Sequence, residues 1–451
     1  MTNRDLLPTN KTMLYSFDGT TTVATQVLRP DRYRDLKKAV SEYPKVSLLG
    51  AGLSYTMAFG ASTHPSIDLR RFNRLLSFDA TKGILKLESG ATLGDTLEFS
   101  IHRGWNISVL PGHPSITIGG CVAFNVHGKS QFSSGNFENI VIALTLFHPD
   151  HGEVNCSREE RADIFWLTIG GMGLTGIILD VTIQLAPLKG ALVERTSIPS
   201  NNLLHAAEQM RELEHDYDYL YSWNNLCRRG GKFGRGVIFA ERFIGDSTKP
   251  QYGEFFTKLT DVKRRPHISI FSKGSAPAIN LVFETKERMF AGTRQLPIGP
   301  ATFPIAGKEF YFSLLGHQGF IEYQCIFPKA SIASSLRLLE ELVTKFDIRP
   351  SLGSLKNFKG RTRDLCFQQD GVCIAIDIPV AGHQSIQKFL SQLDTLVIDH
   401  GGIANLAKDS RLGREVLAKM YPGYGYFWEK LRAWDPKAQF SSELRCRIEP
   451  L

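Results

Sequence analysis

The residues best suited to chemistry gather in a glycine-rich stretch from Val109 to Lys129. It reads VLPGHPSITIGGCVAFNVHGK, and the Pro111-Gly112 pair predicts a turn. Glycine lets the backbone approach a ligand closely, and successive amide groups can form a concave site for a pyrophosphate. On an extended segment, His127 and Lys129 would point to the same side and could meet one ligand. A buried turn with two solvated polar side chains is the alternative.

Two more glycine-rich runs occur. GAGLSY at residues 50–55 follows a predicted strand at residues 46–49, which again suggests amide groups presented to a phosphate. The run from Gly171 to Gly176 matches GxGxxG, the fingerprint of dinucleotide-binding folds. That fingerprint requires a helix after it, whereas the β-branched residues 177–185 predict a strand. The sequence therefore argues against a nicotinamide-type Rossmann domain.

The elements that must position these runs suggest more than one domain in the 451 residues. Residues 1–188 predict many strands and few helices, among them a helix that Thr92 caps and that runs to His102. After a break at Pro187, strands and helices alternate, which fits a sheet with helices on one face. Residues 260–310 are rich in turn residues and predict a mobile, irregular cover over a substrate entrance.

The net charge of +8 is dispersed along the chain, and the sequence holds no polybasic tract of the kind that binds nucleic acid. Such a balance would suit an anionic cofactor or substrate, or an anionic membrane surface. A solvated surface of mixed charge explains it as well.

Seven scattered cysteines without a CxxC motif predict free thiols in a reducing compartment and no zinc site. The N-terminal sequence has no apolar signal region, and no window approaches 18 apolar residues. We therefore expect a cytoplasmic protein with at most peripheral contact to the inner membrane.

The pattern PGxxxxTIGGxxAxNxHGK, the GAGLSY loop and the GGxGLTGII run resemble the FAD-linked oxidases of the vanillyl-alcohol-oxidase superfamily. The runs AKDSR, MYPGY and WDP extend the resemblance over nearly the whole chain. It implies an α+β fold with two domains. A discontinuous FAD-binding domain of the PCMH type would comprise residues 1–188, completed by 402–451. An antiparallel-sheet substrate (cap) domain would comprise residues 189–401.

The resemblance implies non-covalent FAD and no metal. In several relatives a histidine that bonds to the flavin occupies the position of Leu53, whose side chain cannot form that bond. The residues that the resemblance assigns to FAD are Gly50, Ala51, Gly52, Leu53, Ser54, Tyr55, Pro111, Gly112, Thr117, Gly119, Gly120, Asn125, His127, Gly128, Gly171, Gly173, Gly176, Ile177 and Ile178.

The resemblance also assigns catalytic roles to Lys408, His127, Lys129 and Tyr55. Alcohol oxidation needs a hydride acceptor, which flavin N5 supplies, a group that takes the hydroxyl proton, and positive charge near the reduced flavin. Lys408 could serve as the base or as the charge, and the sequence leaves both roles open.

The substrate pocket that the resemblance implies differs from that of the resembled oxidases. Its residues are Gln324, Lys356, Cys373, Ala375, Asn405 and Lys408. Cys373, Ala375 and Asn405 stand where those oxidases have asparagine, cysteine and tyrosine. We therefore expect retained chemistry with a changed substrate.

The function expected from the resemblance is oxidation of a secondary hydroxyl of a sugar or polyprenyl-phosphate sugar to a ketone. A separate NAD(P)H-dependent ketoreductase could complete an epimerisation for a cell-envelope polysaccharide, and a quinone or oxygen would accept the electrons. An aldonolactone or alditol oxidase that uses oxygen is one alternative. A protein that binds FAD without turnover is the other.

Overall fold

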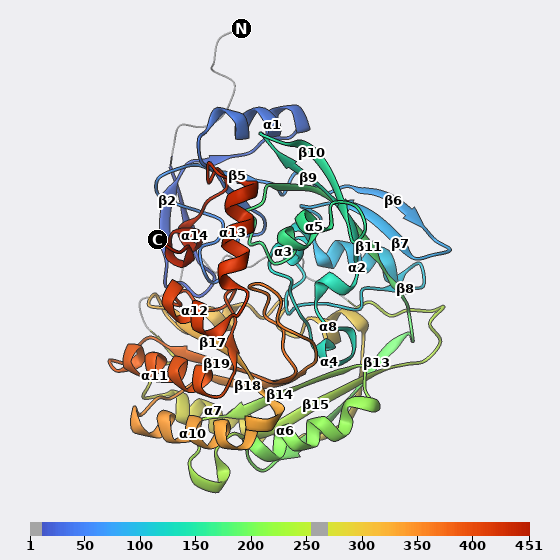
Figure 1. Cartoon of the computed structure of the whole chain (residues 1–451). Coiled ribbons are helices and arrows are strands. Elements are labelled where there is room, and N and C mark those ends of the chain that lie inside the picture. Colours follow the sequence, from blue (N-terminus) through green and yellow to red (C-terminus); the bar gives the residue numbers. More distant parts are fainter. Residues whose placement is uncertain (1–10, 254–268) are drawn as a thin grey trace.

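The structure is a computed structural model that describes residues 11–253 and 269–451 (Figure 1). In the view of Figure 1 the N-terminal part of the chain forms the upper half and the middle part forms the lower half. One hydrophobic cluster runs through both halves and includes Leu97, Ile238 and Trp428. None of the helices in the described residues is long and apolar enough to cross a bilayer.

The N-terminal part is built from short strands. They are β1 Thr12–Tyr15, β2 Thr22–Thr25, β3 Val27–Leu28, β4 Ser47–Leu49, β5 Ser66–Asp68, β6 Leu75–Asp79, β7 Ile84–Glu88, β8 Trp105–Asn106, β9 Val141–His148, β10 Gly152–Ser157, β11 Ile177–Gln184 and β12 Ala186–Pro187. The largest sheet of this part has the order β10-β9-β11-β7-β6 and is antiparallel throughout. A parallel sheet, β3-β5-β4, and the pairs β1-β2 and β12-β8 complete this part.

The helices of this part are short and locally determined. They are α1 Tyr33–Glu42, α2 Leu93–Ile101, α3 Ile118–Ala123, α4 Gln131–Ser134 and α5 Ala162–Thr168. The predicted cap of α2 is confirmed, because the Thr92 side chain accepts a hydrogen bond from the backbone N–H of Asp95. Thr117 caps α3 in the same way, accepting from the N–H of Gly120, so the glycine pair lies in the first turn of a helix.

The middle part forms one antiparallel sheet of eight strands. They are β13 Leu192–Ser200, β14 Tyr219–Asn225, β15 Arg235–Ile244, β16 Gly292–Leu296, β17 Phe320–Pro328, β18 Leu352–Phe358, β19 Gly371–Pro379 and β20 Ile403–Ala404. Their order is β16-β13-β15-β14-β18-β19-β17-β20. The helices α6 Leu203–Glu212, α10 Ile332–Lys345 and α11 Ile386–Asp399 pack on this sheet at the lower edge of Figure 1. This confirms the predicted alternation of strands and helices.

The segment 260–310 is more regular than its sequence predicts. From residue 269 onward it contains α7 Ala276–Met289, β16, α8 Ile298–Thr302 and α9 Phe310–Ser313. The predicted irregular structure is therefore wrong over residues 276–302, the predicted mobile cover stays a prediction, and residues 260–268 lie outside the described residues. The inward side of α7 carries Asn280 and Glu284, and this polar side hid the helical period.

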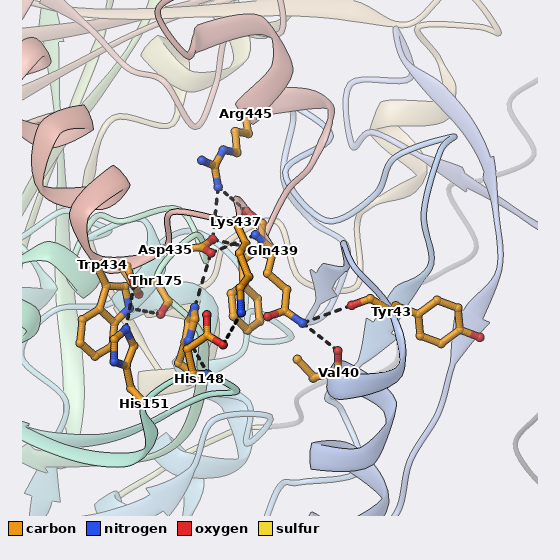
Figure 2. A network of polar contacts seen from close by, with 12 residues as sticks. Val40, Tyr43, His148, His151, Thr175, Trp434, Asp435, Lys437, Gln439 and Arg445 are labelled. Carbon is orange, nitrogen blue, oxygen red and sulfur yellow. Dashed lines mark hydrogen bonds and ion pairs between the residues drawn. The ribbon is translucent and has the colours of Figure 1, made fainter.

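The C-terminal segment returns to the N-terminal part. It contains α12 Arg414–Met420, α13 Tyr424–Trp434 and α14 Glu443–Ile448. Phe440 forms a parallel bridge with Val46 next to β4, and Gln439 donates to the carbonyls of Val40 and Tyr43 (Figure 2).

A second group of contacts joins α13 and the residues after it to β9 and β11. The indole N–H of Trp434 donates to the Thr175 carbonyl at 2.7 Å, and its ring stacks on His151 at 3.8 Å (Figure 2). Buried Asp435 lies between His148 and Arg445, at 3.6 and 3.5 Å. This layout supports the division of the chain into residues 1–188 with 402–451 and residues 189–401, which stays a prediction.

Candidate active site

A cavity of about 370 Å³ lies between the N-terminal part and the eight-stranded sheet. The N-terminal part lines it with the loops at 50–55 and 111–113, with α3 and the residues that flank it, and with residues at and before the start of β11. The sheet lines it with Glu322 and Gln324 of β17 and Lys356 of β18, and Asn405 and Lys408 follow β20. Its size is that of a typical ligand site.

The 50–55 loop, which lines this cavity, contains unpaired backbone N–H groups. Within the described part of the chain, the backbone N–H groups of residues 50–54 donate no hydrogen bond to protein. Because backbone donors are almost always paired, such a row of N–H groups fits an anionic ligand such as a pyrophosphate. A side chain at Gly50 would not fit, since a Cβ there would stand 2.6 Å from the Thr117 hydroxyl oxygen.

The GxGxxG run contributes to the cavity without forming a dinucleotide fold. Gly173 and Gly176 line the cavity, and the chain continues into strand β11 rather than a helix. This confirms the prediction made from the β-branched residues. Gly176 has a φ of 139°, and a Cβ there would lie 2.6 Å from the Phe147 carbonyl oxygen, so only glycine fits.

Most of the predicted cofactor-binding residues line the cavity. They are Gly50, Ala51, Gly52, Leu53, Ser54, Tyr55, Pro111, Gly112, Thr117, Gly119, Gly120, His127, Gly173, Gly176 and Ile178. Four do not line it: Asn125, Gly128, Gly171 and Ile177.

Packing explains these four exceptions. The Asn125 side chain bonds to Glu138 instead, and Ile177 lies in a separate apolar cluster. A Cβ at Gly128 or Gly171 would stand 2.2–2.3 Å from a neighbouring carbonyl oxygen, so close backbone packing requires glycine at both positions.

An ion pair lies at the wall of the cavity. Lys408 Nζ is 3.2 Å from Glu322 Oε2 and 3.9 Å from the centre of the Tyr55 ring. Burial raises the pKa of Tyr55, and the neighbouring Glu322 carboxylate raises it further. The Tyr55 hydroxyl therefore stays protonated, and the Lys408 ammonium group lies between a carboxylate and the face of an aromatic ring.

A second carboxyl group stands directly across the sheet from Glu322. Asp377 on β19 is paired with Glu322 on β17 and is 3% exposed. Burial raises the pKa of Asp377, and the nearby Glu322 raises it further. Its Oδ1 has no hydrogen-bond partner among the described residues. Asp377 is therefore expected to hold its proton, which leaves one negative charge on the carboxyl pair.

A chain of amides connects this wall to His127. Asn405 Nδ2 donates to Gln324 Oε1 at 2.6 Å, and Gln324 Nε2 lies 3.4 Å from His127 Nε2. Burial lowers the pKa of His127 well below its usual value, and Lys356 and Lys408 lower it further. The imidazole is therefore neutral, with its Nε2 facing a donor.

The structure separates His127 and Lys129, although they were predicted to meet one ligand. Lys129 does not line the cavity; its Nζ donates to the Ala301 carbonyl at 2.6 Å and lies 3.7 Å from Glu241 Oε2. Its ammonium also lies 4.4 Å from the centre of the Tyr221 ring. The structure therefore places Lys129 outside the cavity lining, and its predicted catalytic role stays a prediction.

The burial of Lys129 leads to a measurable pH dependence. Burial lowers the pKa of Lys129 to about 7, whereas an unfolded lysine titrates near ~10.4. Between these values the unfolded chain binds one proton more than the folded chain, so stability rises with pH by about 1.4 kcal/mol per unit. We expect Lys129→Met to lose this gain between pH 7.5 and 9, measured by urea unfolding. Exposed Lys359→Met should follow the wild type, and identical pH dependence in all three proteins would contradict the assignment.

Cys373 and Ala375 lie beside the cavity without lining it. Cys373 is paired with Lys356 and Ala375 with Gln324, so both share the face that carries the lining residues. Both are buried, at 1% and 8% exposure. Their predicted contact with a substrate stays a prediction, and in the structure they pack beside residues that do line the cavity.

No cluster of three or more histidine, cysteine or acidic side chains suited to a metal ion occurs in residues 11–253 and 269–451. The cavity is instead built from glycine-rich backbone and one charged wall, an arrangement that suits a large organic anion.

Comparison with known proteins identifies that anion. The family described as an FAD binding domain matches residues 24–157. The chain is 26% identical to decaprenylphosphoryl-beta-D-ribose oxidase of Mycolicibacterium smegmatis over 85% of each chain. The chain is an FAD-dependent oxidoreductase. It is also 30% identical to L-gulonolactone oxidase of Mus musculus over 37% of each chain, and 26% identical to Delta(24)-sterol reductase of Homo sapiens over 36% of this chain and 33% of that one.

The cavity of this FAD-dependent oxidoreductase contains functional candidates that sequence reasoning missed. Glu322 lies two residues before Gln324, and the alternation of a strand places both on one face. That spacing could have revealed it. His113, whose Nε2 lies 3.0 Å from Glu309, and the aromatic residues Phe17, Phe312 and Phe367 also line the cavity. No motif marked them.

We expect the FAD to be held without a covalent bond. Leu53 lines the cavity where a bonding histidine would stand, and a leucine side chain has no nucleophile. Acid precipitation of the holoenzyme should therefore release the yellow colour into the supernatant. Flavin that stays in a thoroughly washed pellet would contradict this expectation.

Proposed function

We propose that this oxidoreductase oxidises a secondary hydroxyl group of a sugar or a lipid-linked sugar to a ketone. The observation that carries the proposal is the Lys408–Glu322 ion pair in the wall of the cavity. The chain of Asn405, Gln324 and His127 beside it offers hydrogen bonds to the remaining hydroxyl groups of such a ring.

Each residue has a separate role in this proposal. Bound FAD supplies the hydride acceptor. Lys408, paired with Glu322, orients the substrate oxygen and stabilises negative charge that develops on it. Glu322, the one carboxylate among the described lining residues, takes the hydroxyl proton. The substrate thereby loses one hydride and one proton and becomes a ketone.

Asp377 supports the proton transfer from the neighbouring strand. Because Asp377 keeps its own proton, the carboxyl pair carries a single negative charge before the reaction and none after Glu322 accepts the hydroxyl proton. Removing charge from a buried pair is favourable. His127 is the weaker candidate, since burial and two lysines disfavour its charged form.

The relatives support a sugar-type substrate. The Mycolicibacterium smegmatis relative is named as an oxidase of decaprenylphosphoryl-beta-D-ribose, a lipid-linked ribose. We infer that a separate NAD(P)H-dependent ketoreductase reduces the ketone, giving net epimerisation at carbon 2 for cell-envelope polysaccharide. A quinone or oxygen would accept the electrons. The match to L-gulonolactone oxidase favours an aldonolactone or alditol as the second candidate substrate.

The exact ring is proposed to differ from ribose. Asn405 bonds to Gln324 in the wall of the cavity, at a position where the resembled oxidases have a larger tyrosine. A site that hydrogen-bonds one set of hydroxyl groups rejects analogues that lack them. We therefore propose poor turnover of decaprenylphosphoryl-ribose and better turnover of a bulkier or differently hydroxylated ring.

Anaerobic reduction of the bound flavin tests this function. The holoenzyme is mixed without oxygen with polyols, aldonolactones, sugar phosphates and polyprenyl-phosphate sugars, and bleaching of the flavin is followed. Rapid bleaching by a lipid-linked sugar would support the proposal, and bleaching by lactones alone would favour the alternative. No bleaching by any alcohol would indicate an FAD-binding protein without turnover.

A further inference from the structure

Helix α7 has its polar side toward the protein. Asn280 Nδ2 donates to the Pro350 carbonyl at 2.8 Å. Glu284 accepts from Asn225 Nδ2 at 2.8 Å and pairs with Arg228 at 3.0 Å. Both Asn280 and Glu284 are 2% exposed. A surface helix of a globular protein ordinarily buries its apolar side, so α7 is reversed.

The outward side of α7 is apolar. Val282 and Met289 are 70% and 71% exposed, and their spacing of seven residues places them on the same side of the helix. Phe290 directly after the helix is 71% exposed, and Leu281 is 43% exposed. These side chains expose apolar surface that water solvates poorly.

The exposed apolar side chains are concentrated in this region. Eight of the fourteen large hydrophobic side chains that are exposed in the described residues fall between positions 270 and 310. Single exposed apolar residues are normal, but Val282 and Met289 lie on one side of α7, and exposed apolar side chains grouped on one side favour an interaction surface. We call these eight residues the α7 surface; they are Ile270, Leu281, Val282, Phe283, Met289, Phe290, Ile305 and Phe310.

The α7 surface reaches the mouth of the cavity. Ile305 is exposed and also lines the cavity. At the start of α7, Ala276 and Ile279 pack in one cluster with Tyr55 and Phe312, which line the cavity as well. Whatever covers the α7 surface therefore also borders the entrance to the site.

Charge around the α7 surface favours an anionic partner. The Lys286 side chain on α7 is 64% exposed, and exposed Lys308 lies between Ile305 and Phe310 in the chain. The acidic side chains of α7 are much less exposed than its lysine, since those of Glu284 and Glu287 are only 3% and 15% exposed.

We propose that the α7 surface docks on an anionic lipid bilayer, with its apolar side chains inserted among the headgroups. Exposed apolar residues interspersed with lysines are the signature of helices that lie in a membrane interface. A symmetric pairing of two copies would bring one lysine-bearing surface against another, which like charges oppose. Anionic headgroups neutralise these lysines instead. The inference is independent of the proposed reaction, since it concerns binding alone.

Flotation of the holoenzyme with vesicles tests the proposal. We expect the wild type to float with vesicles of phosphatidylglycerol and phosphatidylcholine. The triple variant Val282→Ser, Met289→Ser, Phe290→Ser should bind at least about tenfold more weakly, because three inserted apolar side chains are lost. Lys286→Glu should weaken binding to the anionic vesicles about fivefold and leave binding to pure phosphatidylcholine unchanged.

A matched control uses exposed apolar residues elsewhere. The triple variant Leu75→Ser, Leu76→Ser, Tyr426→Ser removes side chains that are 38%, 41% and 55% exposed, and it should float like the wild type. Absence of wild-type flotation, or an equal loss in this control, would overturn the proposal. Circular dichroism and flavin absorbance confirm that each variant is folded and carries FAD.

Two further measurements identify other occupants. A self-associating wild type that becomes monomeric in the α7 triple variant, seen by analytical ultracentrifugation, would assign the surface to a second copy. In the second measurement, Val282→Cys is labelled with an environment-sensitive dye. The background carries Cys446→Ser, because Cys446 is an exposed thiol that the dye would also label. We expect a blue shift on addition of anionic vesicles. A dye already shielded without vesicles would mean that the chain covers its own α7 surface, contrary to the proposal.

Discussion

Replacing Lys408 by methionine is expected to slow flavin reduction by the true substrate about a hundredfold or more, while FAD stays bound. Loss of a group that stabilises charge in the transition state typically costs roughly 10²–10³ in rate. The glycine loops that present the cofactor-binding backbone do not depend on Lys408, because its side chain contacts Glu322 and Tyr55. Stopped-flow measurement of anaerobic bleaching gives the rate, and flavin absorbance gives the occupancy.

The control for this variant is Lys359→Met. Lys359 pairs with Glu214 at 2.8 Å, its side chain is 45% exposed, and neither residue lines the cavity. It should reduce its flavin at the wild-type rate. The midpoint potential of the bound FAD should fall in Lys408→Met only, because a positive charge near the reduced flavin is lost. A normal rate together with a normal potential in Lys408→Met would remove this residue from the mechanism.

Replacing Glu322 by glutamine is expected to lower the rate of flavin reduction by about 10²–10⁴, because an amide cannot accept the hydroxyl proton. Glutamine keeps the size of the side chain, so the packing against β19 is retained. Glu214→Gln removes the carboxylate of the Lys359 pair and serves as the matched control.

The double variant of Lys408 and Glu322 separates two explanations. If the two side chains act as one unit, the combined loss in rate is smaller than the product of the single losses. If the two losses in rate are independent and multiply, the two side chains do not act as one ion pair in the reaction. An unchanged rate in Glu322→Gln would transfer the role of proton acceptor to another residue.

The elements that the sequence predicted well are those determined by local chemistry. The Thr92 cap, the strand after the GxGxxG run and the helices on the eight-stranded sheet all appear within a few residues of their expected places. Their apolar residues recur at helix or strand spacing and face the core, so the sequence pattern alone reveals these elements. Helix α7 breaks this rule, because its buried positions are polar and its apolar positions face solvent.

The site residues were predictable where a sequence motif places backbone groups at the cavity. They were less predictable where a residue reaches the site through its pairing with a neighbouring strand. The GAGLSY loop and Gln324 were found, and both line the cavity. Asp377 was not found, because its contact with Glu322 depends on the register between β17 and β19. Lys129 was misplaced because the alternation of an extended segment ends at Gly128, just before the turn into α4.

The bridge between Val46 and Phe440 sets an order of events during synthesis. Residues far apart in the chain share backbone hydrogen bonds, from Val46 to the Gln439 carbonyl and from Ser441 to the Val46 carbonyl. A ribosome releases residue 440 long after residue 46, so the edge beside β4 stays unpaired while the residues between them are made. An open edge next to apolar strands is prone to aggregation. Completion of the cofactor-binding half is therefore a late, long-range closure, and such closures make folding slow.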